Sequence, residues 1–254
     1  QSPLYGRRTG QLKIEPLAIK HIASFLPTYG VDDLIKMYGA VGTIPFYLKE
    51  MDTSLLFLEN IEKTFLNKAN ILYIEAEFLL KEELRETSVY FNILKAIIDG
   101  ATKVSEIASV SRVDITNINK YLSTLVHLKL IKKIKPLFSP SKEKRYLYQL
   151  EDNYFRFWLT FVYPYQSEIE ENPKNVLKLI EKKQAFYLSH VFETFCQTIF
   201  TLLPLDISRL GIEVGKWWYK EKEIDLVAVN AETKEIVFGE CKWQENVDAL
   251  AIVK

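Results

Sequence analysis

The sequence predicts a mostly helical α+β protein, and three observations along the chain support this prediction. From Leu17 to about Arg85, apolar residues recur at three- and four-residue spacing, a pattern typical of helices that bury one face. Residues 87–150 combine three helical patterns with two short apolar runs that flank a basic loop. Residues 212–241 contain runs rich in β-branched side chains separated by polar turns, which favours three strands.

The N-terminal helical region is divided by residues that interrupt helices. Pro27, Gly30 and the stretch Gly42–Pro45 separate the apolar patterns. Residues 1–16 contain one predicted strand, Gln11–Ile14, and are too few to fold alone. The predicted helices are Leu17–Leu26, Val31–Tyr38, Pro45–Lys49, Ser54–Leu66 and Ile74–Glu83.

The unit 87–150 has the element order of a winged helix. Gly100 is a natural C-cap for its first helix, and Asp114 is placed as the N-cap of its third. Three helices followed by a two-stranded wing are a form of helix-turn-helix, a DNA-binding arrangement. The predicted helices are Val89–Ile98, Val104–Ser109 and Ile115–Leu128, and the returning strand of the wing is Arg145–Leu150.

This winged-helix unit carries the one locally basic surface predicted for the chain. Its third helix is expected to expose Asn117, Asn119, Lys120 and Ser123. We expect Lys120 and the cations of the wing to contact DNA phosphates. The wing cations are Lys132, Lys133, Lys135, Lys142, Lys144 and Arg145. Winged helices also serve as rigid protein-interaction modules, so that alternative stays open.

The segment 151–185 is predicted to be a helical connector. Seven of the residues from Tyr154 to Tyr165 are Phe, Tyr or Trp, and the first helix is expected to end near Pro164. Aromatic side chains at helical spacing indicate an element that docks the winged helix onto the region after it, rather than a platform for stacking bases.

The most informative pattern for chemistry lies in a predicted hairpin near the end of the sequence. Two apolar runs flank a polar Asn-Ala-Glu-Thr-Lys-Glu stretch, and centring the turn there pairs Val229 with Ile236. Counting outward places Asp225 opposite Glu240, with Cβ atoms about 5 Å apart. Lys242 shares the face of Glu240 because side chains alternate along a strand. Two carboxylates this close repel each other, and a divalent cation is the simplest group that relieves the repulsion.

This arrangement resembles the PD-(D/E)XK nuclease superfamily, in which an acid on one strand and an acid-x-Lys motif on the next bind Mg²⁺. The resemblance implies that Asp225 and Glu240 hold the metal, and that Lys242 orients or helps deprotonate the attacking water. Glu193, on the preceding helix, takes the place of a further catalytic acid. The superfamily's Pro-Asp pair is absent, since Ile224 precedes Asp225. The alternative is an ordinary hairpin whose exposed face carries charges.

Composition limits the compartment and the partners. The chain has 254 residues and 33 side chains of each charge, so nucleic acid would have to be bound by local patches. The two cysteines favour a reducing compartment, and the sequence has no secretory segment or apolar run of membrane-spanning length. These features predict a cytoplasmic protein with no membrane partner and leave the oligomeric state open. Because it starts without Met and stops soon after the hairpin, we expect the chain to be part of a longer protein.

Nearly the whole chain also resembles the C-terminal part of an archaeal P-loop ATPase family. The stretches that carry this resemblance are SPLYGRRTGQ, YGAVGTIPFYL, ENIEKTFLN, EAEFLLKEELRETSVYFNILKAI and EDNYFRFWLTFVYP. The resemblance implies the tail of an ATPase core (1–16), a helical lid (17–86), a winged helix (87–150), a helical connector (151–185) and a truncated α/β domain of the restriction-endonuclease type (186–254).

The same resemblance assigns two further features to ATP. Arg7 or Arg8 is expected to lie near the nucleotide phosphates, since a guanidinium matches phosphate oxygens. Pro45 takes the place of a lid proline that packs against adenine, although Thr43 replaces the family's second glycine. The chain has no Gly-x-x-x-x-Gly-Lys-Ser/Thr motif, so ATP is expected to bind only with a core that precedes Gln1.

Three functions remain open from the sequence. In the first, the lid and the winged helix couple the nucleotide state of an ATPase to a nuclease-like domain that binds or cuts nucleic acid. In the second, the same folds form a non-catalytic interaction module. In the third, the chain is a DNA-binding regulator that acts through its winged helix. Whether the protein is an enzyme is therefore open.

Overall fold

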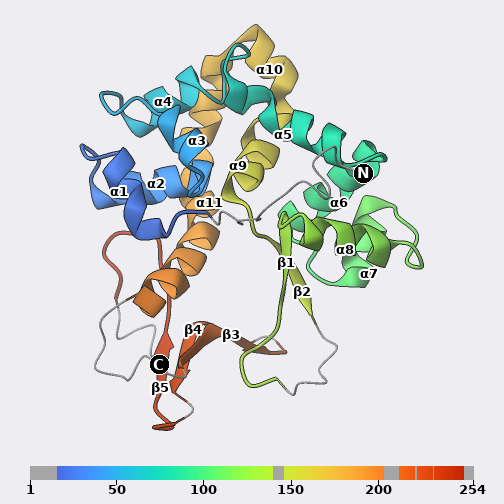
Figure 1. Ribbon diagram of the computed structural model, residues 1–254, viewed down its shortest axis with the longest axis vertical. Helices are drawn as coiled ribbons and strands as arrows, with labels where there is room; N and C mark the ends of the chain where they lie inside the picture. The colour runs from blue at the N-terminus through green and yellow to red at the C-terminus, as the bar shows by residue number, and fades with distance from the viewer. Residues whose placement is uncertain (1–15, 140–145, 203–211, 221, 231, 249–254) are drawn as a thin grey trace, which may run out of the picture.

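The computed structural model describes residues 16–139, 146–202, 212–220, 222–230 and 232–248, and the fold is the predicted mixture of α and β. The helices form one body, and a three-stranded sheet lies against one end of it (Figure 1). A smaller two-stranded sheet extends from the helical body toward the larger sheet (Figure 1). Among the described residues, no helix has both the length and the apolar character to cross a membrane. The predicted strand Gln11–Ile14 lies outside the described residues.

The N-terminal helices confirm most of the predicted pattern. Gly42 ends one helix with a φ of 64°, a backbone conformation that favours glycine, and Pro45 begins the next. One helix starts three residues later than predicted, because the Asp52 carboxylate accepts hydrogen bonds from the backbone and hydroxyl of Ser54 and fixes a turn. The elements are η1 (Ile19–His21), α1 (Ile22–Phe25), α2 (Val31–Val41), α3 (Pro45–Lys49), α4 (Phe57–Lys63) and α5 (Ile71–Glu83).

The predicted winged-helix order follows. It consists of α6 (Thr87–Ile98), α7 (Val104–Ser111), α8 (Ile118–His127) and the antiparallel strands β1 (Ile131–Ile134) and β2 (Leu147–Leu150). Gly100 adopts a φ of 102° after α6, as its C-cap position requires. Asp114 accepts hydrogen bonds from the backbone and hydroxyl of Thr116, so α8 begins at Ile118 rather than at Ile115.

The aromatic helix α9 (Asn153–Phe161) is the centre of the helical core (Figure 1). Asp152 caps it by accepting a hydrogen bond from the Phe155 N–H at 3.0 Å. Helix α9 packs against α6 of the winged helix and also against α2 and α5. It therefore joins the winged helix to the N-terminal helices, which the sequence did not predict. The short elements η2 (Tyr163–Tyr165) and α10 (Gln166–Glu171) follow it.

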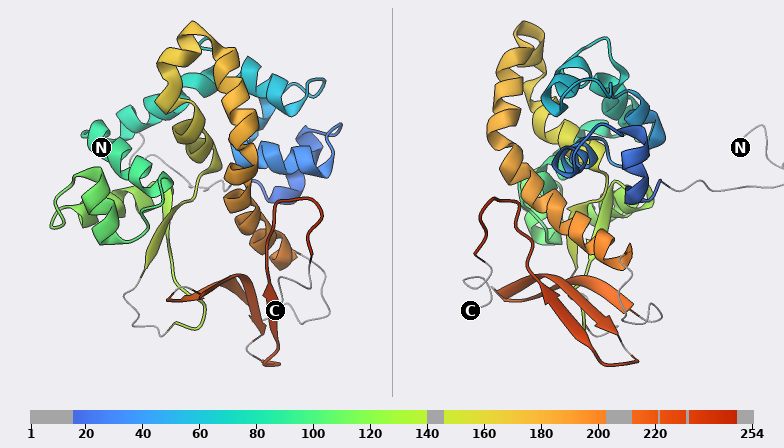
Figure 2. Two further views of the ribbon diagram at one scale, coloured as in Figure 1. Left: turned by 180° about the vertical axis from the view of Figure 1, so that it is seen from behind. Right: turned by 90° about the vertical axis from the view of Figure 1, so that its left-hand side faces the viewer.

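Helix α11 (Pro173–Leu202) connects the helical core to the larger sheet (Figure 2). It runs unbroken through residues 185–186, where the sequence predicted a domain boundary. Its residues Leu188 and Val191 are buried in the helical core, and its C-terminal part packs on β3 and β4. The sheet has the antiparallel order β3 (Ile212–Tyr219), β4 (Lys222–Asn230), β5 (Ile236–Gly239). Val229 pairs with Ile236, as predicted.

Candidate functional site

Three acids from two elements converge where α11 meets the sheet. Glu193 lies on α11, and Glu223 and Asp225 lie on β4. Each offers one carboxylate oxygen, and these oxygens lie within 4.8 Å of one another. Glu223 and Asp225 share a face because side chains two residues apart on a strand point to the same side. Carboxylate oxygens are the ligands that Mg²⁺ prefers, so the donor set of this acid cluster fits a hard divalent cation.

A β-bulge lies at the acid cluster. Two residues of β4, Asp225 and Leu226, face one residue of β3, Lys216. A bulge bends the strand and redirects its side chains, and bulges are over-represented next to active sites. Four consecutive residues of β4, the central strand, are buried, from Asp225 to Ala228.

Hydrogen bonds from two other segments hold Asp225 in place. The side chain is buried, with 8% of the residue's surface exposed. Its carboxylate accepts a hydrogen bond from the Cys241 N–H at 3.0 Å. The Gln197 side-chain amide, on α11, donates to the Asp225 carbonyl at 2.6 Å. Asp225 therefore ties together α11, β4 and the segment after β5.

Lys216 lies between two of the acids. Its ammonium donates to the Glu193 carboxylate at 2.7 Å and also pairs with Glu223. Only 14% of the Lys216 side chain is exposed. Burial lowers the pKa of Lys216, but hydrogen bonds and charges from Glu193 and Glu223 outweigh burial and raise this pKa above its ordinary value. Lys216 is therefore a fixed positive charge within the acid cluster.

Glu240 lies outside the acid cluster formed by the described residues. The β4–β5 pairing ends at Leu226 and Gly239, so Glu240 directly follows the paired part of β5. Its carboxylate accepts a hydrogen bond from the Lys242 ammonium at 2.5 Å. This hydrogen bond is the largest effect on Lys242, and it raises the pKa of that side chain despite some burial. A metal ion shared by Asp225 and Glu240 stays a prediction, and the structure groups Asp225 with Glu193 and Glu223.

Two thiols also meet beside Asp225. Cys196 of α11 and Cys241 are half-buried, and their side chains hydrogen-bond to each other. The hydrogen bond from Cys241 lowers the pKa of Cys196, against the effects of burial and of the nearby acids. The same hydrogen bond, with burial, raises the pKa of Cys241. The contact places the segment after β5 directly against α11.

Glu223 and Lys216 were not among the predicted site residues. The signal for Glu223 was present, because it lies two residues before Asp225 and therefore on the same face of the strand. Lys216 had no such signal, since its position opposite Asp225 depends on the bulge.

The basic surface predicted on the winged helix lies partly within the described residues. The four residues expected to face outward on α8 are all exposed. Lys133 and Lys135 are exposed, with their ammonium groups over the Tyr146 ring at 5.6 and 4.9 Å. Lys132 is half-buried, and burial lowers its pKa, which makes it a poorer phosphate ligand than its neighbours. Lys142, Lys144 and Arg145 lie outside the described residues.

Of the residues predicted to contact ATP, the structure describes Pro45. It is exposed at the start of α3, and the loop Gly42–Ile44 before it borders a cavity of about 340 Å³. Tyr38 and Asn153 line the other side of this cavity. Arg7 and Arg8 lie outside the described residues.

Comparisons with known proteins found a matching family and a similar protein. Residues 158–252 match the DUF234 family, described as archaea bacterial proteins of unknown function. The chain is also similar to the uncharacterized protein MJECL04 of Methanocaldococcus jannaschii, with 33% identity across 98% of this chain and 56% of that protein. The chain thus spans about half the length of this relative. No solved structure matches the chain. The segment that matches the family contains all three residues of the acid cluster.

Proposed function

We propose that the C-terminal part of the chain is a Mg²⁺-dependent nuclease whose metal ligands are Glu193, Glu223 and Asp225. The observation that carries this proposal is the convergence of three carboxylates from α11 and β4 within 4.8 Å. A bulge at Asp225 and an adjacent acid-x-Lys sequence, Glu240 to Lys242, add to it.

The roles of the residues follow from their chemistry. The three carboxylates bind the ion, and Asp225 is oriented for this by the Cys241 N–H. When bound, Mg²⁺ supplies positive charge that stabilises the phosphate during attack by water. Lys242 carries a proton at neutral pH, as lysines do, and Glu240 raises its pKa further, so it acts as a hydrogen-bond donor that orients the water or the phosphate. Glu240 is a positioning residue that holds Lys242.

A cleavage assay on labelled single-stranded and duplex DNA tests this proposal. Asp225→Asn and Glu223→Gln should each reduce Mg²⁺-dependent cleavage by about a hundredfold or more, because each removes a metal ligand. Glu213→Gln, which alters an exposed acid on β3 outside the acid cluster, is the matched control and should cleave normally. Cleavage that persists in both Asp225→Asn and Glu223→Gln would contradict the proposed site.

We further propose that ATP, bound by the longer protein, controls this activity. The loop Gly42–Ile44 borders a cavity, as a lid over a nucleotide would, and the Methanocaldococcus relative is longer than this chain. Arg7, Arg8 and Pro45 are the residues assigned to the nucleotide. ATP hydrolysis by the longer protein, and a change in DNA cleavage when ATP is added, are the expected results.

The exposed lysines of the winged helix support a second activity, the binding of DNA phosphates. Lys120, Lys133 and Lys135 lie on the surface of α8 and the wing. Their positions favour a DNA-holding role beside the nuclease site over a purely structural role. A chain that neither binds nor cuts DNA would favour the remaining possibility, a non-catalytic interaction module.

A further inference from the structure

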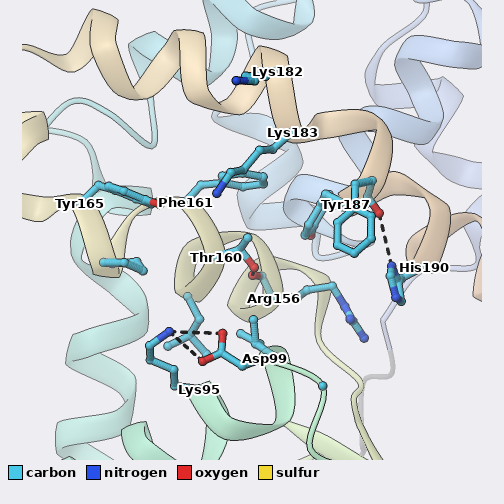
Figure 3. A pocket seen from close by; sticks show the side chains of 15 residues that line it. Lys95, Asp99, Arg156, Thr160, Phe161, Tyr165, Lys182, Lys183, Tyr187 and His190 are labelled. Carbon is cyan, nitrogen blue, oxygen red and sulfur yellow. Dashed lines mark hydrogen bonds and ion pairs between the residues drawn. The ribbon is translucent and has the colours of Figure 1, made fainter.

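A cavity of about 700 Å³ opens between α6, α9 and α11, and none of the three acids of the acid cluster lines it (Figure 3). Its volume is within the range of about 300–1,000 Å³ that is common for small-molecule sites. No residue predicted from the sequence as a site residue lines it. The lining residues include cationic and aromatic side chains from all three helices.

The charges around this cavity favour an anion. Lys95, Arg156, Lys182 and Lys183 line it, and Asp99 is the one carboxylate among the lining residues. Asp99 pairs with Lys95 at 3.0 Å, so the other three cations give the cavity a net positive charge (Figure 3). The whole chain, by contrast, has equal numbers of basic and acidic residues. The excess of positive charge is therefore a local feature of this cavity.

Aromatic rings line the same cavity. Phe161 and Tyr187 are buried, and their ring centroids lie 5.3 Å apart. Phe186 is 77% exposed, more than any other large apolar side chain in the described part of the chain. Its ring meets the His190 ring edge to face, with the ring centroids 5.3 Å apart. An exposed ring beside lysines matches the combination with which proteins hold single-stranded nucleic acid, stacking for the base and cations for the backbone.

The cavity lies next to the acid cluster along α11. His190, which lines the cavity, and Glu193 are three residues apart, so about 4.5 Å of helix axis separates them. Glu193, one of the three acids, therefore lies within about one turn of α11 from the lining of the cavity.

We infer that this cavity binds one nucleotide of a single-stranded nucleic acid, with the base stacked on Phe186 and the phosphates on Lys182, Lys183 and Arg156. A single strand fits because its bases are free to stack, whereas those of a duplex are not. A strand is favoured over a free nucleotide because the cavity lies beside the acid cluster. The preference for a strand that runs from the cavity to the acid cluster rests on the proposed nuclease function, but the binding of a nucleotide in the cavity does not.

Fluorescence anisotropy with a labelled oligothymidylate tests the inference, with a chelator present so that no cleavage occurs. Phe186→Ala should weaken binding about tenfold through loss of stacking. Lys182→Ala combined with Lys183→Ala should weaken binding and reduce the slope of log affinity against log salt by about 1.4. The matched controls are Phe78→Ala, an exposed phenylalanine on α5, and Lys174→Ala combined with Lys178→Ala, exposed lysines on α11 that do not line the cavity.

Several results would overturn the inference. These are equal affinities for the cavity and control variants, equal competition by duplex DNA, or equal competition by thymidine monophosphate. Self-association of the chain that depends on Phe186 would instead assign the ring to an interface. Strand binding that is lost in Phe186→Ala, in a wild-type chain that does not cleave DNA, would support the inference and contradict only the proposed nuclease.

Discussion

Lys216 is the residue that balances the charge of the acid cluster. Its ammonium contacts Glu193 and Glu223 from a position opposite the bulge in β4. The contact with Glu193 is the stronger contributor to stability, because the Glu223 side chain is 53% exposed and water screens that pair. A divalent cation bound by the same carboxylates would compensate the same negative charge. Lys216 and the ion therefore act on one set of acids.

Replacing Lys216 separates these two contributions. Lys216→Met keeps the apolar stem and removes the charge, so the free energy of unfolding should fall by about 1–3 kcal/mol. Mg²⁺ should then stabilise the variant more than it stabilises the wild type, as measured by urea denaturation with and without the ion. If Mg²⁺ stabilises both equally, Lys216 and the ion do not share the acid cluster.

The difference in stability between wild type and Lys216→Met should depend on pH in a direction set by the pKa of Lys216. The pKa of Lys216 is raised in the folded protein. Its contribution to stability is therefore fully present below the unfolded lysine pKa of about 10.4 and is lost as pH rises through the higher folded value. The stability gap between wild type and Lys216→Met should thus be constant near neutral pH and shrink only in strong alkali.

Part of the acid cluster was predictable from single residues. Asp225 was expected to bind a metal and Glu193 to be a further catalytic acid, and the register that brings Asp225 to the end of β5 follows from the position of the turn. The bulge was not predictable, because one extra residue in β4 has no local sequence signature here. Without it, Lys216 could not be placed opposite Asp225.

Among the elements, α9 and α5 are joined by an unusual hydrogen-bond arrangement. The Tyr154 hydroxyl of α9 donates to the Leu72 carbonyl and accepts from the Ala76 N–H, both at 3.0 Å. These two backbone groups of α5 are four residues apart and would bond to each other in a regular helix. The hydroxyl is therefore inserted into the hydrogen-bond ladder of α5. The Trp158 Nε1–H adds a bond to the next carbonyl, that of Tyr73, at 2.7 Å.

Tyr154→Phe tests whether this insertion anchors the two helices. The ring stays packed, but the buried carbonyl and N–H of α5 lose their partner, so the free energy of unfolding should fall by about 1–3 kcal/mol. Tyr163→Phe is the control, because it removes a hydroxyl elsewhere in the aromatic core. The Tyr163 ring stacks on the Phe91 ring, with the centroids 4.6 Å apart. An unchanged stability of Tyr154→Phe would mean that α5 closes its own hydrogen bond when the hydroxyl is removed.

Helix positions were predictable from apolar spacing, whereas several helix ends were not. The starts of α4 and α8 are set by turns in which Asp52 and Asp114 bond to neighbouring hydroxyl groups. Such turns compete locally with helix formation, and the spacing of apolar residues does not reveal them. The unbroken course of α11 was also missed, since its apolar pattern changes where it passes from the helical core to the sheet.

For the whole molecule, α11 is the element that links the helical core to the acid cluster. Its Tyr187 hydroxyl donates to the Gly39 carbonyl of α2 at 2.6 Å, and its Glu193 and Gln197 reach the sheet. A shift of α11 would therefore change the distance between Glu193 and the two acids of β4. This connection gives the proposed control by ATP a physical route from the N-terminal helices to the metal ligands.

Calorimetric titration of Mg²⁺ into the chain is the direct test of whether the acid cluster binds a metal ion. We expect one ion per chain, with affinity reduced at least about tenfold in Asp225→Asn and Glu223→Gln and unchanged in Glu240→Gln and Glu213→Gln. Absence of Mg²⁺ binding in the wild type, or binding that survives Glu223→Gln and is lost in Glu240→Gln, would contradict the acid cluster as the metal site.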